Sequence, residues 1–256
     1  MKSNIALGSS LLVAPEDLPL RAAETVKSWS KTLIVAPHPD DESLGCGGAI
    51  ALLRKFDCEV IVLVISDGTL SHPNSKKFPP PVLRDLREKE ILAALEILGV
   101  SAADKTTFLR YRDRSVPNEN SENFASAVEI CAGYLTEHSP ATILLPWRRD
   151  PHPDHCASNQ IIRGAKSHSG LKARLIEYPI WLWELATTAD APQQGEAKAW
   201  RLDIAPVTLQ KQRAIAAHQS QITDLIDDDP AGFRLTPETL ANFADAWEIY
   251  LEEIDE

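Results

Sequence analysis

The stretch "TLIVAPHPDDESLGCGGAIALLRKFDCEVIVLVI", residues 32–65, decides the fold class. Its two ends, residues 32–36 and 59–65, are continuous apolar runs rich in β-branched residues, which are typical of strands buried on both faces of a parallel sheet. Residues 43–56, between these runs, are long enough for a helix that crosses over the sheet. The stretch therefore predicts a strand–helix–strand unit with a right-handed crossover.

The same alternation continues toward the C-terminus. Further strands are expected over residues 105–109, 141–147, 173–179 and 199–204, and further helices over 82–99, 122–138 and 154–168. Two last helices are expected over 207–226 and 237–254, joined by a turn at 227–233. This order predicts an α/β fold that is Rossmann-like, with a mostly parallel sheet, helices on both faces and additional C-terminal helices.

Length and composition predict one domain. The chain has 256 residues, of which 44% are hydrophobic, and this is enough for one large core. No internal repeat, low-complexity tract or long linker divides the sequence. We therefore expect a single domain over 1–256, with an N-terminal extension over 1–30 and a C-terminal helical segment over 207–256.

Charge and cysteine content narrow the classes of partner and compartment. The chain carries 26 Lys and Arg against 37 Asp and Glu, a net charge of -11 that opposes binding to nucleic acid and to anionic membranes. The four cysteines form no C-x-x-C pair and are expected to be reduced thiols of a cytoplasmic protein. Residues 4–14 are mildly apolar but too short to span a bilayer, so we expect neither export nor an anchor.

Two clusters of titratable residues each follow a predicted strand. Residues 38–41 read His-Pro-Asp-Asp, and residues 152–155 read His-Pro-Asp-His. In both clusters, proline holds the preceding histidine in an extended conformation, and the fourth residue falls where a helix can begin. Because ligands of doubly wound sheets bind beyond the carboxyl ends of the strands, the two clusters could share one rim.

A metal site is the simplest explanation for two clusters of titratable residues at two strand ends. Two histidines and one carboxylate are a common ligand set for a catalytic zinc with an open position, and the same ligand types also admit Fe(II). Each cluster alone has a simpler explanation, since loop histidines are usually solvated and acidic residues are favoured at helix N-termini. The repetition of the pattern at two strand ends favours the metal.

Other catalytic patterns fit less well. Gly45 and Gly47 suggest a dinucleotide fingerprint, but its third small residue would fall on Ile50, so these glycines are better explained by close packing of a helix on the sheet. The sequence contains no G-x-S-x-G elbow. Cys156 lies beside His155, yet a small buried residue on the first turn of a helix is the simpler interpretation.

These motifs resemble the PIG-L/LmbE-like deacetylases, zinc-dependent enzymes that remove the acetyl group from substrates containing N-acetylglucosamine. "APHPDDESLGCGG" (36–48) resembles the first family motif and "RDPHPDH" (149–155) the second. "LREKEILAALEILGV" (86–100) and "RAIAAHQSQ" (213–221) fall where weaker family patterns are expected. The resemblance covers most of the chain.

The resemblance implies a set of roles. His38, Asp41 and His155 would hold the zinc, and Asp40 would be the general base. His152 would polarise or protonate the tetrahedral intermediate, and Asp154 would orient His152. Amide hydrolysis requires such groups, because the carbonyl is a poor electrophile that needs an activated water, a base and a group that stabilises the oxyanion.

Roles for three further residues stay open. Arg87 resembles a family position on the substrate side of the pocket, although a solvated helix arginine is an equal alternative. Glu90 has a structural alternative, and His218 either reaches the site or serves packing or capping. The loop "SDGTLSHPNS" (66–75), which contains Ser71 and His72, replaces a Thr-x-Gly-Glu pattern and leaves the substrate's identity open.

The leading hypothesis is a cytoplasmic, zinc-dependent N-deacetylase that acts on a small-molecule amino sugar or its conjugate. A zinc hydrolase of another N-acyl substrate is the first alternative. A non-catalytic metal- or sugar-binding protein is the second, and the presence of Asp40 argues against it because binding alone needs no base. A homo-oligomer is compatible with the sequence, which does not define the oligomeric state.

Overall fold

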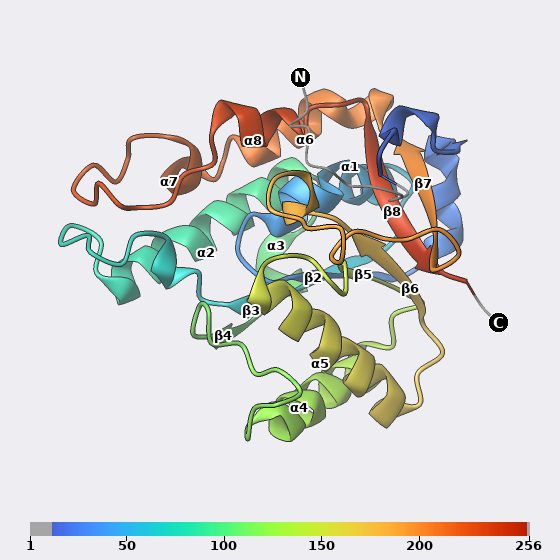
Figure 1. Ribbon diagram of the computed structural model, residues 1–256, viewed down its shortest axis with the longest axis horizontal. Coiled ribbons are helices and arrows are strands. Elements are labelled where there is room, and N and C mark those ends of the chain that lie inside the picture. The colour runs from blue at the N-terminus through green and yellow to red at the C-terminus, as the bar shows by residue number, and fades with distance from the viewer. Residues whose placement is uncertain (1–11, 255–256) are drawn as a thin grey trace.

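An eight-stranded, mostly parallel sheet runs through the computed structural model, which describes residues 12–254 of the chain (Figure 1). Its strands are β1 (Leu20–Arg21), β2 (Thr32–Ala36), β3 (Val60–Ser66), β4 (Thr106–Tyr111), β5 (Thr142–Pro146), β6 (Arg174–Tyr178), β7 (Ala197–Asp203) and β8 (Trp247–Glu253). Their order across the sheet is β1-β7-β8-β6-β5-β2-β3-β4. β8 is antiparallel to both of its neighbours, and the other pairs are parallel.

Helices cover both faces of this sheet. They are α1 (Asp41–Lys55), α2 (Pro80–Ile97), α3 (Ala102–Lys105), α4 (Phe124–His138), α5 (Pro153–Ser169), α6 (Thr208–Ile215), α7 (Gln219–Ile222) and α8 (Pro237–Ala241). Short 3-10 helices are η1 (Pro15–Asp17), η2 (Ala23–Trp29), η3 (Thr69–Ser71), η4 (Trp181–Trp183) and η5 (Ala205–Val207). Figure 1 shows α4 and α5 on one face and α1, α2 and α6 on the other, which confirms the predicted α/β class.

The strand–helix–strand unit of residues 32–65 forms as expected. Thr32 pairs with Val60 and Ala36 with Val64, and every residue of β2 and β3 is buried, as continuous apolar runs predict. Gly45 lets α1 lie close to the sheet, whereas Gly47 faces the side chain of Lys211 on α6 and not the sheet. A Cβ atom on Gly45 would come within 2.4 Å of the Tyr178 ring, so the close-packing interpretation of this glycine is confirmed.

The C-terminal segment differs from the prediction of two long helices. The helix expected over 237–254 is wrong, because only Pro237–Ala241 is helical and Trp247–Glu253 forms β8. β8 pairs with β7 over the whole of its length, from Trp247 opposite Asp203 to Glu253 opposite Ala197. The helix expected over 207–226 is interrupted, since α6 ends at Ile215 and α7 begins at Gln219.

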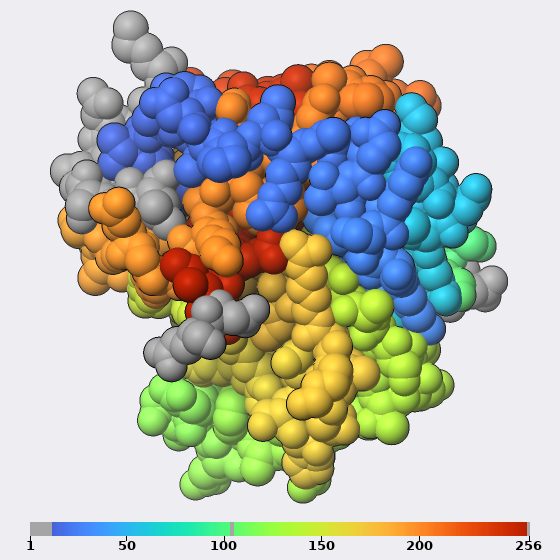
Figure 2. Space-filling view, turned by 90° about the vertical axis from the view of Figure 1, so that its right-hand side faces the viewer, coloured from blue at the N-terminus to red at the C-terminus, as the bar shows by residue number. Residues whose placement is uncertain are grey.

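The N-terminal segment packs on the edge of the sheet. β1 pairs in parallel with β7, and Arg21 Nη1 lies 3.0 Å from Glu252 Oε1. Figure 2 shows this side, where the blue N-terminal segment lies against the orange and red C-terminal part of the chain. Over residues 12–254, no helix is long and apolar enough to cross a membrane. The expectation for residues 4–14 falls mostly outside the described residues, which begin at 12.

The strand order changes direction at β2. From β2 the chain adds β3 and β4 on one side, then returns to place β5 and β6 on the other. In open α/β sheets, such a switch point creates a crevice beyond the carboxyl ends of the central strands. The two His-Pro-Asp clusters follow β2 and β5, so both lie at this crevice.

Candidate active site

The two clusters, more than a hundred positions apart in the chain, meet at one point. His38 Nδ1 lies 3.3 Å from Asp41 Oδ2 and 3.3 Å from His155 Nε2, and the last two atoms are 3.2 Å apart. All three side chains are buried, and each sits at the start of a helix or in the turn just before it. The structure therefore brings the three predicted metal ligands together as an almost equilateral triangle of donor atoms.

This triangle fits a divalent metal. Zinc bonds to nitrogen and oxygen of roughly 2.0–2.1 Å in a tetrahedron would separate neighbouring donors by about 3.3–3.4 Å. The donor chemistry, two imidazoles and one carboxylate, is that of catalytic sites with an open fourth position. His152 also brings a ring nitrogen within 4.8 Å of nitrogens of His38 and His155, on the side that faces the cavity.

Carboxylates hold the outer edge of both imidazoles. His38 Nε2 lies 3.1 Å from Asp154 Oδ2 and 3.4 Å from Asp113 Oδ1, and His155 Nδ1 lies 3.2 Å from Asp150 Oδ1. Such partners orient ligating imidazoles and make them more basic. Asp113 and Asp150 were not predicted. Asp150 is in the quoted motif "RDPHPDH", and Asp113 follows β4 at the same rim, so its position after a strand was the available signal.

The charges within the cluster are strongly coupled. Burial acts to lower the pKa of His38, but hydrogen bonds to Asp113, Asp154 and Asp41 outweigh it and hold the pKa well above its usual value. Burial likewise opposes the charge on His155, yet Asp41 and Asp150 raise its pKa to about 9. Burial alone would raise the pKa of Asp41, whereas His155 and His38 hold it well below the usual range. The pocket is thus built to stabilise positive charge beside Asp41.

Asp40 occupies a strained position beside the triangle. Its φ is 145°, a region that favours glycine, and its N–H donates to Glu42 Oε2 at 3.0 Å. Burial raises the pKa of the Asp40 carboxyl to about 6, although the nearby Arg87 acts to lower it. A carboxylate with a pKa closer to neutrality is a better proton acceptor than an ordinary aspartate. The adjacent carboxylates therefore occupy different environments, as the assignment of different roles requires.

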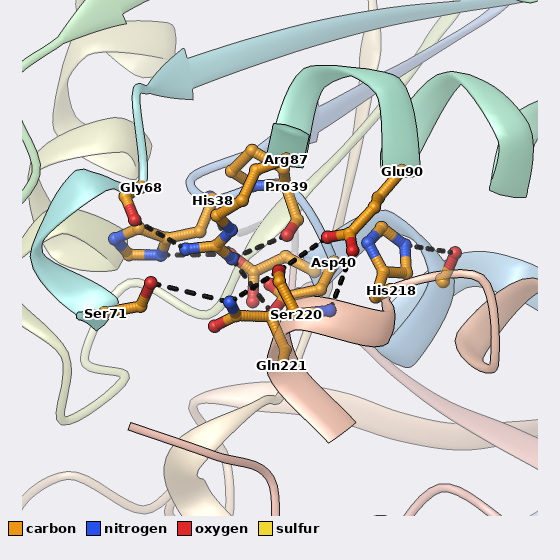
Figure 3. A network of polar contacts seen from close by, with 12 residues as sticks. His38, Pro39, Asp40, Gly68, Ser71, Arg87, Glu90, His218, Ser220 and Gln221 are labelled. Atoms are coloured by element: carbon orange, nitrogen blue, oxygen red, sulfur yellow. Dashed lines mark hydrogen bonds and ion pairs between the residues drawn. The ribbon is translucent and has the colours of Figure 1, made fainter. Parts of the chain in front are cut away.

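Arg87 holds the turn that carries Asp40. The side chain is only 3% exposed, so the alternative of a solvated helix arginine is wrong. Its Nη2 donates to Pro39 O at 2.6 Å and to Asp40 Oδ2 at 3.1 Å, and Nη1 donates to Gly68 O at 2.8 Å (Figure 3). Arg87 also lines the cavity. Its contacts to the chain are those of a residue that positions Asp40.

Residues 218–221 support the same turn from the other side. His218 Nε2 lies 3.0 Å from Glu42 Oε1, the carboxylate whose other oxygen accepts the Asp40 N–H. Burial acts to lower the pKa of His218, but Glu42 raises it above its usual value, which favours an ion pair. Glu90 has a structural role, because its two oxygens accept from Ser220 N at 2.7 Å and Ser220 Oγ at 2.6 Å (Figure 3).

The second cluster differs from prediction in one pairing. The Asp154 carboxylate contacts His38, not His152; its link to His152 is the backbone N–H of Asp154, which donates to His152 Nδ1 at 3.2 Å. Burial lowers the pKa of His152 to about 3, with His38 and His155 adding to the shift. Burial of this side chain thus favours its neutral form. His152 is therefore suited to donate a hydrogen bond more than to release a proton.

The remaining candidates are not part of the ligand triangle. Cys156 Sγ donates to Asp150 O at 3.0 Å, and burial raises the pKa of its thiol to about 11, so it is not an activated nucleophile. His72 is 2% exposed and contacts Ser71 Oγ through Nδ1 at 3.2 Å. Ser71 lines the cavity, whereas His72 packs behind it against Gly232.

A cavity of about 330 Å³ opens over the triangle. His38, Asp40, Asp41 and His152 form its polar floor. This volume lies within the usual size of small-molecule sites, about 300–1,000 Å³. The cavity can therefore hold one small ligand with its reacting group against the ligand triangle.

Comparisons with known proteins agree with this chemistry. Residues 33–166 match the family model PIG-L, described as GlcNAc-PI de-N-acetylase. A probable N-acetyl-alpha-D-glucosaminyl L-malate deacetylase 2 of Bacillus subtilis is 27% identical over 197 residues, which cover 76% of this chain and 84% of the relative.

Solved structures share the fold. N,N'-diacetylchitobiose deacetylase from Pyrococcus horikoshii has a TM-score of 0.62 at 23% identity, covering 79% of this chain and 74% of that chain. The 4-carboxy-2-hydroxymuconate hydratase GalB from Pseudomonas putida has a TM-score of 0.58 at 19% identity, covering 89% and 97%. Because the fold also occurs in a hydratase, the fold alone does not define the reaction. The family match is more informative, since it spans more than half of the chain and contains both clusters, and the chain belongs to the PIG-L family of de-N-acetylases.

Proposed function

We propose that this chain is a zinc-dependent enzyme that removes the N-acetyl group from an N-acetylated amino sugar or its conjugate. The observation that carries the proposal is the triangle of His38, Asp41 and His155, of which the first two line the floor of the cavity together with Asp40. The deacetylase named for the Bacillus subtilis relative supports the class of substrate.

Each group in the site has a defined task in this reaction. A divalent metal held by His38, Asp41 and His155 would supply Lewis acidity and lower the pKa of water. Asp40 accepts a proton from the attacking water, and Arg87 keeps its carboxylate in place. His152, neutral and facing the cavity, donates a hydrogen bond where negative charge develops on the substrate.

We propose zinc as the metal because the three donor atoms, 3.2–3.3 Å apart, have the spacing of a tetrahedral zinc site; the donor set itself is shared with Fe(II). We also place the enzyme in the cytoplasm. All four cysteines lie in the described part of the chain and are free thiols, as a reducing compartment allows.

The test is acetate and free-amine release from N-acetylglucosamine and its glycosides by protein loaded with Zn²⁺ or, anaerobically, with Fe²⁺. We expect hydrolysis by the zinc form and loss of it in His155→Ala. His168→Ala is the matched control, because His168 is exposed on the same helix and should leave activity unchanged. Hydrolysis of other N-acyl compounds with no release from any amino sugar would favour the alternative hydrolase.

A further inference from the structure

The mouth of the active-site cavity is apolar, in contrast to its floor. Trp181, Leu185, Phe233 and Leu235 line it, and we call these four residues the apolar wall. Leu185 is 59% exposed and Phe233 is 39% exposed, whereas the floor residues His38, Asp40 and Asp41 are all buried. The two exposed residues therefore lie toward solvent, beyond the position of the reacting amide.

The apolar wall is held rigidly by the site itself. Trp181 N donates to Asp150 Oδ2 at 2.9 Å, and Asp150 also faces the ligand His155. Phe233 N donates to Ser71 O at 2.6 Å, and the rings of Trp181 and Phe233 meet edge to face with centroids 5.7 Å apart. Two segments distant in sequence, around Trp181 and around Phe233, thus form one continuous apolar surface, as is common in ligand pockets.

Charge at the cavity does not select an anionic group. Asp113 and Glu184 line it together with the floor carboxylates, and Arg87 is paired with Asp40. Arg114 contributes one further positive charge. The chain as a whole carries a net charge of -11. Beyond the floor and the paired side chains of Asp113 and Arg87, the lining therefore offers an anionic aglycone one positive and one negative side chain and no net attraction, while an uncharged apolar aglycone would bury surface against the wall.

We propose that the substrate's amino sugar carries an apolar aglycone, an aromatic ring or an alkyl chain, and that the apolar wall binds it. This proposal rests on the proposed deacetylase function and adds the chemical class of the conjugate. Pockets that bind small ligands are lined mostly by apolar and aromatic side chains, with a few polar groups that fix the orientation of the ligand. The floor then acts on the acetamido group while the aglycone lies against Trp181, Leu185 and Phe233.

The experiment compares four N-acetylglucosaminides of each anomer: methyl, octyl, phenyl and a carboxyalkyl glycoside. We expect kcat/KM for the octyl or phenyl glycoside to exceed that for the methyl glycoside by about tenfold or more, a ratio typical of added apolar contact in a pocket. The carboxyalkyl glycoside should be no better than the methyl one. The octyl and phenyl arms distinguish an alkyl from an aromatic aglycone.

Variants locate the preference on the wall. Leu185→Ser and Phe233→Ser should each reduce the octyl-to-methyl or phenyl-to-methyl ratio of kcat/KM within the same variant. Leu209→Ser is the control, because Leu209 is 70% exposed on α6 and does not line the cavity. Equal kcat/KM for all glycosides, or a preference for the carboxyalkyl one, would overturn the apolar aglycone but leave the deacetylase intact. No acetate release from any glycoside would overturn both proposals.

Discussion

Asp40 and Asp41 are adjacent and chemically identical, yet the turn between β2 and α1 directs them to different partners. Asp41 contacts both histidines of the triangle, whereas Asp40 contacts Arg87. The positive φ of Asp40 is what separates the two carboxylates, and such strain persists only where surrounding contacts impose it. The proposed division of roles therefore depends on backbone geometry as much as on residue type.

This division predicts two different phenotypes for the same substitution. Asp40→Asn should keep near-normal zinc content and KM but lose kcat by about 10²- to 10⁴-fold, as for a general base. Asp41→Asn should lose zinc as well as activity, because a ligand is removed. Metal analysis and steady-state kinetics of both variants check this. Loss of zinc from Asp40→Asn would show that the two roles are assigned in the wrong order.

Gly68 makes room for Arg87, and this gives a second prediction. Its φ is +62°, and an added Cβ would lie 2.4 Å from Arg87 Nη1. Gly68→Ala should displace the guanidinium from Asp40 and lower kcat by up to about 10²-fold, the effect of a misplacement of roughly 1 Å. Zinc content should remain.

Gly170→Ala is the matched control for this variant. Gly170 also has a positive φ, +69°, but an added Cβ would meet nothing within 4 Å. Both variants should lose about 1 kcal/mol of unfolding free energy from backbone strain. Only Gly68→Ala should lose kcat, and equal kinetics of the two folded variants would contradict a positioning role for Arg87.

Among the elements, the short segment from His218 to α7 supports the turn that carries Asp40 and also contacts α2. It connects to the catalytic turn through Glu42, and it connects to α2 through the contacts of Ser220 with Glu90. From the sequence, His218 was expected either to reach the site or to serve packing or capping. The structure shows a third possibility, in which His218 acts on Asp40 through an intermediate carboxylate.

We therefore expect His218→Ala to lower kcat by about 10- to 100-fold, a loss typical of partners that orient site residues. KM and zinc content should change much less. His218→Gln, which retains an N–H donor toward Glu42, should recover part of the activity. A rise in KM at unchanged kcat would instead place His218 in substrate binding.

β8 shows why one element could not be predicted from its own pattern. "WEIYLEE" (247–253) continues the helical spacing of the residues before it, and short apolar segments are ambiguous between the two periods. Its place between β6 and β7 buries Glu248, Ile249, Tyr250 and Leu251 in succession. Aromatic and β-branched side chains favour such a buried strand, but only the neighbouring strands decide the outcome.

For the molecule as a whole, the features that could be predicted are those that depend on local sequence patterns. The α/β class followed from apolar runs, and the meeting of His38 with His155 followed from the rule that sites lie at strand carboxyl ends. The carboxylates that contact the outer edges of these two imidazoles could not be predicted in the same way. Asp113 reaches His38 from the loop after β4, and nothing in the local sequence indicates which side chain of that loop faces inward.

The triangle of His38, Asp41 and His155 joins parts of the chain that lie far apart. Metal binding to it should therefore raise the free energy of unfolding of the whole protein. His38 and Asp41 belong to the β2–α1 connection, and His155 belongs to α5, more than a hundred positions later. A metal that binds this folded triangle and not the unfolded chain stabilises the protein by about 2.7 kcal/mol at a free concentration of 100 times Kd.

We therefore expect Zn²⁺ added to chelator-treated protein to raise Tm progressively with concentration, as followed by circular dichroism. His155→Ala should abolish most of the rise, and His168→Ala should retain it. An equal rise in both variants would mean that the stabilising metal binds elsewhere in the fold.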